Sequence, residues 1–447
     1  MMPPSQGGGL TPAEPDRPGG APPTTLLPGG PGVLRASDRA QQTLLLLAVA
    51  FVLLALVADL TDSSELTSAG TFGAMLRLTV PILLAGLGGL WAERAGVVNI
   101  GLEGMMILGT WFGAWAGFEL GPWWGAALGI VGGGLGGLLH AIGTVTFGID
   151  HVVSGVAINI LAAGVARFLS VIFFTGQGGG ATQSPQVAGN VGRFTLPFVA
   201  GGELFGWRSP DLMGWLAQRE WFLVSDLGAL LKGFTSNLSW LTVIAILLVG
   251  VSFYVLWRTP VGLRLRSVGE HPVAAESLGV RVYSLKYAAV VVSGGLAGLG
   301  GAFLVLEQAR IYREGQTGGR GFIGLASTIF GNWRPGGVAA ASGLFGYADA
   351  LQLRSRTAVH GLLLFVTIGL VLAAIWFGVR KARPVLAMIL VAVAGLFYWW
   401  YAVTDTVPRQ FIFFLPHVTT LLVLSFAAQR LRPPAADGVR YRRGQLY

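Results

Sequence analysis

The sequence predicts an all-α fold, a polytopic transmembrane helical bundle of about 10–12 helices. Of its 447 residues, 53% are hydrophobic and only 11% are charged, so the chain carries more apolar surface than one soluble core can bury. Several windows reach the roughly 20 apolar residues that a spanning helix needs. The 68 glycines favour closely packed helices. Small-residue spacings such as Gly133–Gly137 and Gly294–Gly298 mark interfaces between helices.

Ten apolar segments account for most of the predicted crossings. They cover residues 43–60, 73–91, 96–118, 123–147, 150–175, 239–257, 284–306, 358–379, 385–403 and 411–428. Residues 322–353 are also apolar, but Asn332, Pro335 and the glycines that follow interrupt them. We expect two shorter or partly re-entrant helices there, because irregular backbone is tolerated at membrane depth only when it is buried in protein.

Composition divides the chain into three parts. Residues 1–40 are rich in Pro, Gly, Ser and Thr, which predicts a disordered tail. Residues 41–430 form the transmembrane domain, and residues 431–447 form a basic tail. Lys and Arg are enriched in cytoplasmic loops, so the basic residues of both tails and of the loop at 258–284 place these parts in the cytoplasm.

The same orientation puts the loop at 176–238 outside the cytoplasm. Its Trp207, Trp215 and Trp221 suit a segment at the membrane interface. Residues 358–408 are interpreted as an inserted helical hairpin, which enters and leaves the membrane on one side and so preserves the topology.

Several activities are excluded by what the sequence lacks. The net charge of +9 does not indicate nucleic-acid binding, because the basic residues lie at segment ends. The chain has no cysteine, and its histidines lack metal-ligand spacing. None of its three lysines follows a glycine, so a phosphate-binding Walker A loop is absent. The sequence therefore predicts no catalytic site, no metal site, no cofactor and no ATP bound by this chain.

Two polar side chains stand out within apolar sequence between Glu93 and Gly104. Asn99 and Glu103 are four positions apart, which would place them on one face of a helix. Ionisable groups inside a membrane usually face a cavity or a partner, so both residues are candidates to line a polar path. The alternative is that Glu103 only holds helices together.

A polar stretch at residues 258–284 links two predicted spanning helices. Pro272 suits the first turn of a helix and Gly279 suits its end. We expect a short helix that docks into another protein through Ala274 and Ala275; the alternative is a solvated loop with one helical turn. The residues assigned to this docking element are Gly269, Glu270, His271, Pro272, Ala274, Ala275, Glu276 and Gly279.

The interrupted region after residue 320 supplies three further candidates. Phe322, Asn332 and Trp333 are expected to belong to a broken, protein-buried element near the path, since backbone interrupted by Pro335 cannot face hydrocarbon. These three residues complete the predicted path.

At these residues the chain resembles the nucleoside-type branch of the ABC importer permeases, a family that also includes ribose and branched-chain amino acid permeases. The motifs follow one another in order over most of residues 70–440. They are Glu93–Gly104, Gly269–Val280, Gly321–Ala326, Phe330–Gly337, Leu344–Leu351 and Arg432–Gly438.

The resemblance implies an inner-membrane permease subunit that moves a nucleoside or related small solute by alternating access. It implies three protein partners: a cytoplasmic ATPase that binds the ATP, a second and usually different permease chain, and an external lipoprotein that delivers the solute. In that family the loop matching Gly269–Val280 carries the coupling helix that docks on the ATPase.

The sequence leaves three alternatives to a nucleoside importer open. A simple sugar such as ribose could be the solute, because the resemblance covers sugar permeases as well. An ion-driven secondary transporter would need embedded acidic residues, and the spanning segments offer few besides Glu103. An intramembrane enzyme would need the metal or nucleophile motifs that the chain lacks.

Overall fold

The computed structural model describes residues 36–178, 180–204, 206–354, 356–408, 411 and 431–444. Residues 51–447 form one compact unit and residues 1–50 another, of which only the beginning of α1 (Ala36–Leu60) is described. The predicted N-terminal tail and the apolar segment 411–428 therefore lie almost wholly outside the described residues.

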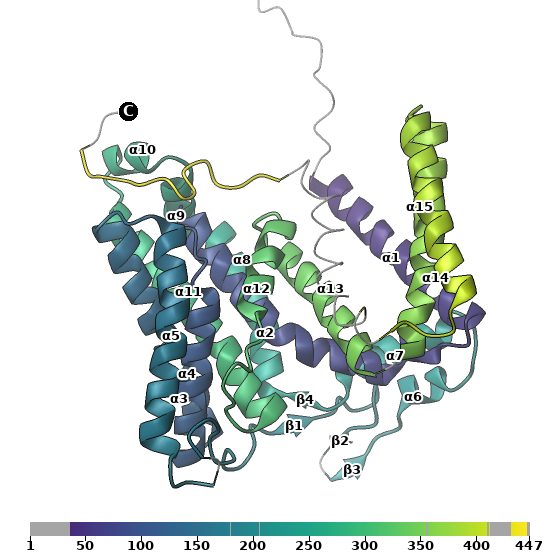
Figure 1. The fold of residues 1–447 in the computed structure, drawn as a ribbon, viewed down its shortest axis with the longest axis horizontal. Coiled ribbons are helices and arrows are strands. Elements are labelled where there is room, and N and C mark those ends of the chain that lie inside the picture. The colour runs from purple at the N-terminus through teal and green to yellow at the C-terminus, as the bar shows by residue number, and fades with distance from the viewer. Residues whose placement is uncertain are drawn as a thin grey trace, which may run out of the picture. The chain divides into compact units, whose positions relative to one another are not determined.

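Helices make up nearly all the regular structure of the described chain (Figure 1), which confirms the predicted fold class. After α1, the α-helices are α2 (Ala69–Arg94), α3 (Leu102–Glu119), α4 (Pro122–Ala141), α5 (His151–Phe174), α6 (Leu212–Ala217), α7 (Val224–Thr235), α8 (Trp240–Arg258), α9 (Pro260–Glu270), α10 (Pro272–Ser277), α11 (Val282–Phe303), α12 (Arg320–Phe330), α13 (Pro335–Arg354), α14 (Arg356–Ile375) and α15 (Pro384–Val403).

Short irregular helices and strands complete the described elements. The former are a 3-10 turn, η1 (Ser64–Leu66), and three π-helical turns, η2 (Ile142–Thr146), η3 (Leu304–Ala309) and η4 (Trp376–Arg380). Two small antiparallel sheets pair β1 (Arg193–Phe194) with β4 (Leu238–Ser239), and β2 (Glu203–Leu204) with β3 (Trp207–Arg208). All four strands begin within the segment 176–238, which was predicted as a long external loop.

Seven helical segments of the described chain are long and apolar enough to cross a membrane. This confirms a polytopic bundle, although the number is smaller than the expected 10–12. The helices α3 and α13 are not among these seven, Leu47–Leu60 of α1 and the whole of α12 are shorter apolar helices, and one predicted segment lies outside the described residues. The seven segments cover residues 64–94, 122–146, 151–174, 240–258, 282–309, 357–380 and 384–403.

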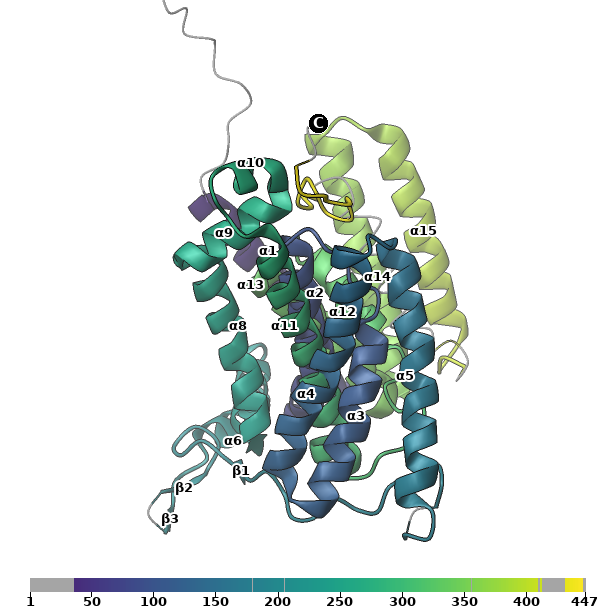
Figure 2. The same cartoon turned by 90° about the vertical axis from the view of Figure 1, so that its left-hand side faces the viewer.

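The centre of the bundle depends on glycines where α4 meets α11. The helices α4 and α11 lie side by side (Figure 2), and Gly133 and Gly137 of α4 lie directly against the backbone of Gly294 and Gly298 of α11. A Cβ atom on Gly133 would overlap the carbonyl oxygen of Gly294, so no larger side chain fits. The two small-residue spacings therefore form one shared contact, which confirms their prediction as helix interfaces.

The chain breaks between α2 and α3 and doubles back. Gly96 ends α2 with a φ of +75°, and its N–H donates to the carbonyl of Glu93 at 2.8 Å. This is the left-handed helix cap that glycine favours. Leu102 at the start of α3 lies beside Gly88 of α2. A Cβ atom on Gly88 would be 3.4 Å from the Leu102 side chain. Residues 95–101 therefore run back alongside the last turns of α2.

The polar loop between α8 and α11 folds into α9 and α10 at one end of the bundle, opposite the strands (Figures 1 and 2). Pro272 opens α10 and Gly279, with a φ of +80°, follows its end. Two hydrogen bonds cap the end of the helix. The N–H of Gly279 donates to the carbonyl of Glu276 at 2.8 Å, and the N–H of Val280 donates to the carbonyl of Ala275 at 3.0 Å. The predicted short helix is confirmed, and α9 adds a second.

We predict that Gly133→Ala lowers the thermal stability of the solubilised protein. The added methyl group meets backbone atoms of α11 that cannot move aside, and overpacking of this kind costs about 1–3 kcal/mol. Gly134→Ala is the matched control, because the nearest atom to its Cβ is 3.9 Å away. Thermal unfolding in detergent measures both, and equal unfolding temperatures would contradict the packing argument.

Candidate functional site

Side chains of neighbouring helices bond the irregular backbone of residues 95–101. His140 of α4 has Nε2 3.0 Å from the carbonyl oxygen of Val98, which can only accept, so Nε2 donates. Its Nδ1 then accepts from the hydroxyl of Ser154 at 2.9 Å. His151 at the start of α5 accepts the Val98 N–H on Nδ1 at 3.2 Å. Two histidines thus satisfy both backbone groups of one residue.

Asn159 of α5 and Lys286 of α11 bond the rest of this break. The Asn159 amide donates to the carbonyl of Ile100 at 3.1 Å and accepts the N–H of Gly104 at 2.7 Å. The Lys286 ammonium lies 3.4 Å from the carbonyl of Gly96. The break is therefore held by protein groups, as irregular backbone within a bundle requires. Sequence reasoning missed these residues, although histidines, asparagine and lysine in apolar segments were the available signal.

Asn99 lies in the break and not on a helix. Because α3 begins at Leu102, the expectation that Asn99 and Glu103 share one helical face is wrong. Asn99 is fully buried; its amide donates to the hydroxyl of Ser293 at 2.9 Å and accepts the N–H of Gly101 at 3.1 Å. The side chain thus connects the break to α11.

Glu103 caps the N-terminus of α12. Its two carboxylate oxygens accept the N–H groups of Gly319 at 2.9 Å and Gly321 at 2.7 Å. A negative charge is favourable at this end of a helix, where backbone N–H groups have no intrahelical partner. These contacts support the alternative interpretation of Glu103, in which it holds two helices together.

The turn between α12 and α13 packs against the end of α2. Asn332 and Trp333 both have a φ of +51°, a left-handed conformation that Asn adopts more readily than most residues and that is uncommon for Trp. Trp333 is buried, its indole N–H donates to the Glu93 carboxylate, and its carbonyl accepts from the Arg94 guanidinium at 2.7 Å. Asn332 accepts the backbone N–H of Arg432 at 2.9 Å.

Phe322 faces away from this packing. The inner face of α12 carries Gly321, Gly324 and Ser327, which are buried, whereas Phe322 is 47% exposed. The expectation of burial is therefore wrong for Phe322, because it lies on the opposite side of the helix from the contacts with α2 and α3.

The side chains of the predicted docking element divide into buried and exposed sets. Ala275 is 3% exposed and packs with Val268 and Tyr441, so its expected contact with a partner is wrong. Ala274 is exposed. Leu278, which directly follows α10, has 84% of its surface exposed. Sequence reasoning missed it because small residues were given priority; an apolar residue just before the capping glycine was the signal.

The remaining residues of this element differ in burial, and one of them pairs with a distant helix. Gly269 and Pro272 are buried, while His271 and Gly279 are exposed. Glu270 is half exposed, and its carboxylate lies 3.8 Å from the guanidinium of Arg94. The end of α9 is thereby linked to the end of α2.

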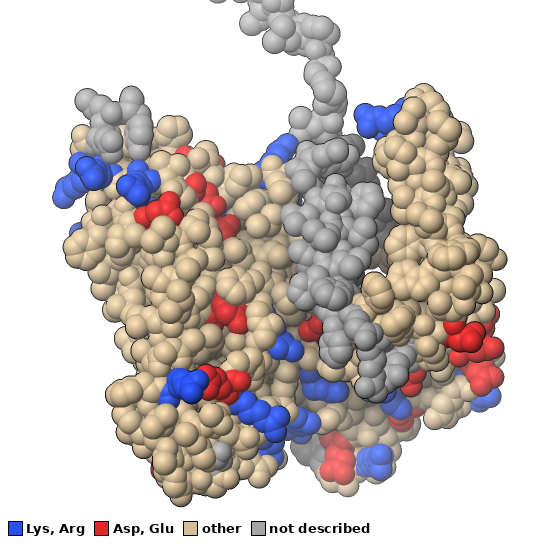
Figure 3. Space-filling view, viewed as in Figure 1, with Lys and Arg blue, Asp and Glu red and all other residues tan. Residues whose placement is uncertain are grey.

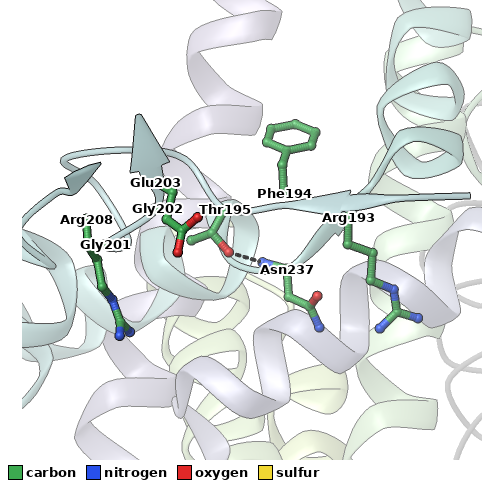
Figure 4. A pocket seen from close by; sticks show the side chains of 8 residues that line it. All are labelled: Arg193, Phe194, Thr195, Gly201, Gly202, Glu203, Arg208 and Asn237. Carbon is green, nitrogen blue, oxygen red and sulfur yellow. Dashed lines mark hydrogen bonds between the residues drawn. The ribbon is translucent and has the colours of Figure 1, made fainter. Parts of the chain in front are cut away.

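An open pocket of about 480 Å³ lies at the other end of the bundle, within the segment 176–238 (Figure 4). The side chains of Arg193 and Asn237 point the same way from its wall. Arg193 also pairs with the buried Glu307 of η3 at 3.0 Å, which joins the pocket to α11. The pocket is lined by Arg193, Phe194, Thr195, Gly201, Gly202, Glu203, Arg208 and Asn237.

Charged side chains gather toward the two ends of the molecular face in Figure 3, and uncharged side chains cover most of the surface between them. This distribution suits a protein surrounded by lipid. Within the described part of the chain, no group of three or more His, Asp or Glu residues lies close enough together to hold a metal ion.

Seven candidate spans, a buried broken backbone and a folded polar loop at one end define a multi-pass membrane protein. Comparison with known families agrees. The chain belongs to the family described as branched-chain amino acid transport system / permease component, whose model matches residues 71–375. It is a transport subunit of the bacterial inner membrane, and the resemblance found in its motifs is confirmed.

Similar proteins are known from several organisms. The chain is 31% identical to the guanosine ABC transporter permease protein NupQ of Bacillus subtilis, over 83% of this chain and 96% of that protein. It is 30% identical to the nucleoside ABC transporter permease protein NupC of Lactococcus lactis, over 82% and 95%. It is 33% identical to a putative glucose ABC transporter permease protein of Haloferax volcanii, over 65% and 79%. No solved structure matches the chain.

We predict that Glu103→Ala destabilises the protein, because the buried N–H group of Gly321 and the half-buried N–H group of Gly319 lose their acceptor. Each buried donor left without a partner costs about 1–3 kcal/mol. Glu103→Gln keeps one acceptor oxygen and should lose less. Thermal unfolding of both variants checks the order. Wild-type stability in Glu103→Ala together with lost transport would instead favour a role in the path.

Proposed function

We propose that this chain is the membrane-spanning permease subunit of an ATP-binding cassette importer that carries a nucleoside across the inner membrane. Two relatives, each matched over more than four-fifths of the chain, are named as guanosine and nucleoside permease proteins. These names support a nucleoside as the solute. The second candidate is a simple sugar such as ribose, because a third relative is named as a putative glucose permease.

The observation that carries the ATP-driven mechanism is the loop formed by α9 and α10. It is a capped two-helix element at one end of the bundle, and it presents Leu278 with 84% of its surface exposed. Burying such a side chain in a partner's groove contributes about 1.5–3 kcal/mol. We assign this surface to a cytoplasmic ATPase, which binds and hydrolyses the ATP for which this chain has no phosphate loop.

The solute path is assigned to the exposed face of α12. This helix has 11 residues and spans roughly 16 Å, too short to cross a bilayer. Its inner face is fixed by α2, α3 and the Glu103 cap, while Phe322 projects from the other face. Three other residues are assigned a supporting role, in which they hold the elements that carry the path. They are Asn99, Asn332 and Trp333, and each bonds to the backbone or side chain of a neighbouring element.

The proposed mechanism is alternating access with two permease chains and an external solute-delivering lipoprotein. Hydrolysis in the ATPase moves α10, and the movement switches the path between outward-open and inward-open. No covalent step takes place in this chain. Its residues hold the path elements, present the docking loop and exclude lipid from the irregular backbone.

Reconstitution into liposomes tests the proposal. The permease pair is assembled with and without its ATPase and lipoprotein, and uptake of labelled guanosine and labelled ribose is measured. We expect guanosine uptake that needs both ATP and the ATPase. Uptake of ribose alone would favour the sugar candidate, and uptake driven by a proton or sodium gradient without the ATPase would overturn the assignment.

We predict that Leu278→Asp weakens ATPase association roughly 30-fold or more, because an anchor side chain at an interface contributes about 2 kcal/mol or more. Leu278→Met keeps an apolar side chain of similar volume and should bind like the wild type. Titration of the purified permease with its ATPase measures both affinities. Equal binding by the two variants would show that Leu278 is not at the interface.

A further inference from the structure

The C-terminal residues 431–444 lie across the docking loop, a placement that the proposed function leaves unused. Two backbone contacts fix them to the end of α9. The N–H of Ala435 donates to the carboxylate of Glu270 at 3.1 Å, and the N–H of Ala436 donates to the carbonyl of Gly269 at 2.9 Å. The segment is therefore bonded to the loop through main-chain groups.

The same segment also contacts the elements behind the path. The N–H of Arg432 donates to the side chain of Asn332 in the α12–α13 turn at 2.9 Å. Gly438 has a φ of +74°, and a Cβ atom on it would lie 3.4 Å from the side chain of Val98 in the break. One short stretch of chain thus joins the docking loop, the break and the α12–α13 turn.

Three backbones meet at this junction. A Cβ atom on Gly96 would lie 3.0 Å from the carbonyl oxygen of Ala436, and one on Gly269 would overlap the carbonyl oxygen of Arg94. The end of α2, the end of α9 and the C-terminal segment therefore contact one another directly. Contacts between rigid main chains transmit displacement more directly than contacts between flexible side chains.

Tyr441 anchors the far end of the segment in the docking loop. Its side chain is buried with Val268, Ala275 and Val282, and its ring lies 5.6 Å from that of Tyr283. Arg443, two residues after Tyr441, pairs with Glu276 of α10 at 3.3 Å. The apolar contact makes Tyr441 part of the core beneath α10.

Asp437 occupies the middle of the junction. Burial raises the pKa of its carboxyl group to about 7, and the nearby positive charges of Lys286 and Arg94 act in the opposite direction. Lys286 also bonds the break at Gly96, so one of the positive charges that act on Asp437 belongs to a residue that contacts the break.

The loop is joined in sequence only to α8 and α11. The break at 95–101 and the turn at 331–334 lie far away in the sequence and must follow the loop through non-covalent contacts. The C-terminal segment is hydrogen-bonded to the loop and to the turn, and it packs against the break.

We propose that residues 431–444 act as a positioning strap that makes the break and the α12–α13 turn move with α9 and α10 when the ATPase moves the loop. The inference rests on the proposed function, because the strap would transmit the ATP-driven movement of the loop to the elements that hold the path. Tyr441 and Ala436 are its principal positioning residues: neither lies on the exposed face assigned to the ATPase or on the path.

Two substitutions in the complete importer test the strap. Tyr441→Ala removes the buried ring, whereas Tyr441→Phe retains it. Ala436→Pro removes the N–H that bonds Gly269 and provides a second variant if Tyr441→Ala fails to fold. Arg442→Ala is the control, because Arg442 is exposed. Three quantities are measured for each variant. They are amide hydrogen exchange at residues 95–101 and 272–282, co-purification of the ATPase, and the amount of nucleoside moved per ATP hydrolysed.

We expect Tyr441→Ala to lower exchange protection at both sites roughly tenfold to a hundredfold. The ATPase should still co-purify, while transport per ATP falls several-fold. Ala436→Pro should act in the same direction, and Tyr441→Phe and Arg442→Ala should match the wild type. These results together would support the strap, since a residue that only stabilises α10 would leave residues 95–101 unchanged.

Protection at 95–101 and transport per ATP that both stay at the wild-type level in Tyr441→Ala and Ala436→Pro would overturn the strap. A wild-type importer that shows no ATP-dependent uptake would instead refute the proposed function. The two failures are distinguishable, because the exchange measurement judges the strap without any transport.

Discussion

Backbone N–H and C=O groups inside a lipid bilayer have no water to bond, so every interruption of a helix must find its partners within the protein. The break at residues 95–101 is where this constraint acts most strongly. His140 and His151 bond Val98, and Asn159 bonds the segment from α5. Helices α4, α5 and α11 are therefore fixed relative to the end of α2, and α12 follows because α3 caps it.

Glycine contacts make this arrangement possible. Polar side chains can reach the broken backbone only when the helices that carry them approach closely, and Gly133 of α4 meets Gly294 of α11 with their main chains in contact. The same α11 begins directly after the docking loop and carries Ser293, which bonds Asn99. A displacement of the loop thus acts on a rigid helix that touches the break.

The end of the bundle near α10 combines two requirements that compete for the same residues. The docking loop needs an exposed surface for a partner, yet six residues of helix cannot hold a fixed shape alone. The chain resolves this by burying Ala275 over Tyr441 and exposing Leu278. The side of α10 that faces the protein supplies rigidity, and the other side remains available for contact.

The sequence by itself determined the helical bundle, the small-residue interfaces and the start and end of α10, because these depend on composition, spacing and local backbone preference. Only the tertiary structure decided what the polar residues do. Glu103 bonds N–H groups about 216 residues further along the chain, and Ala275 and Phe322 differ in burial because of the helices packed beside them. Sequence spacing placed Asn99 on a helix, but the left-handed Gly96 and side chains from three other helices hold it in a break, since such partners are brought together only by folding.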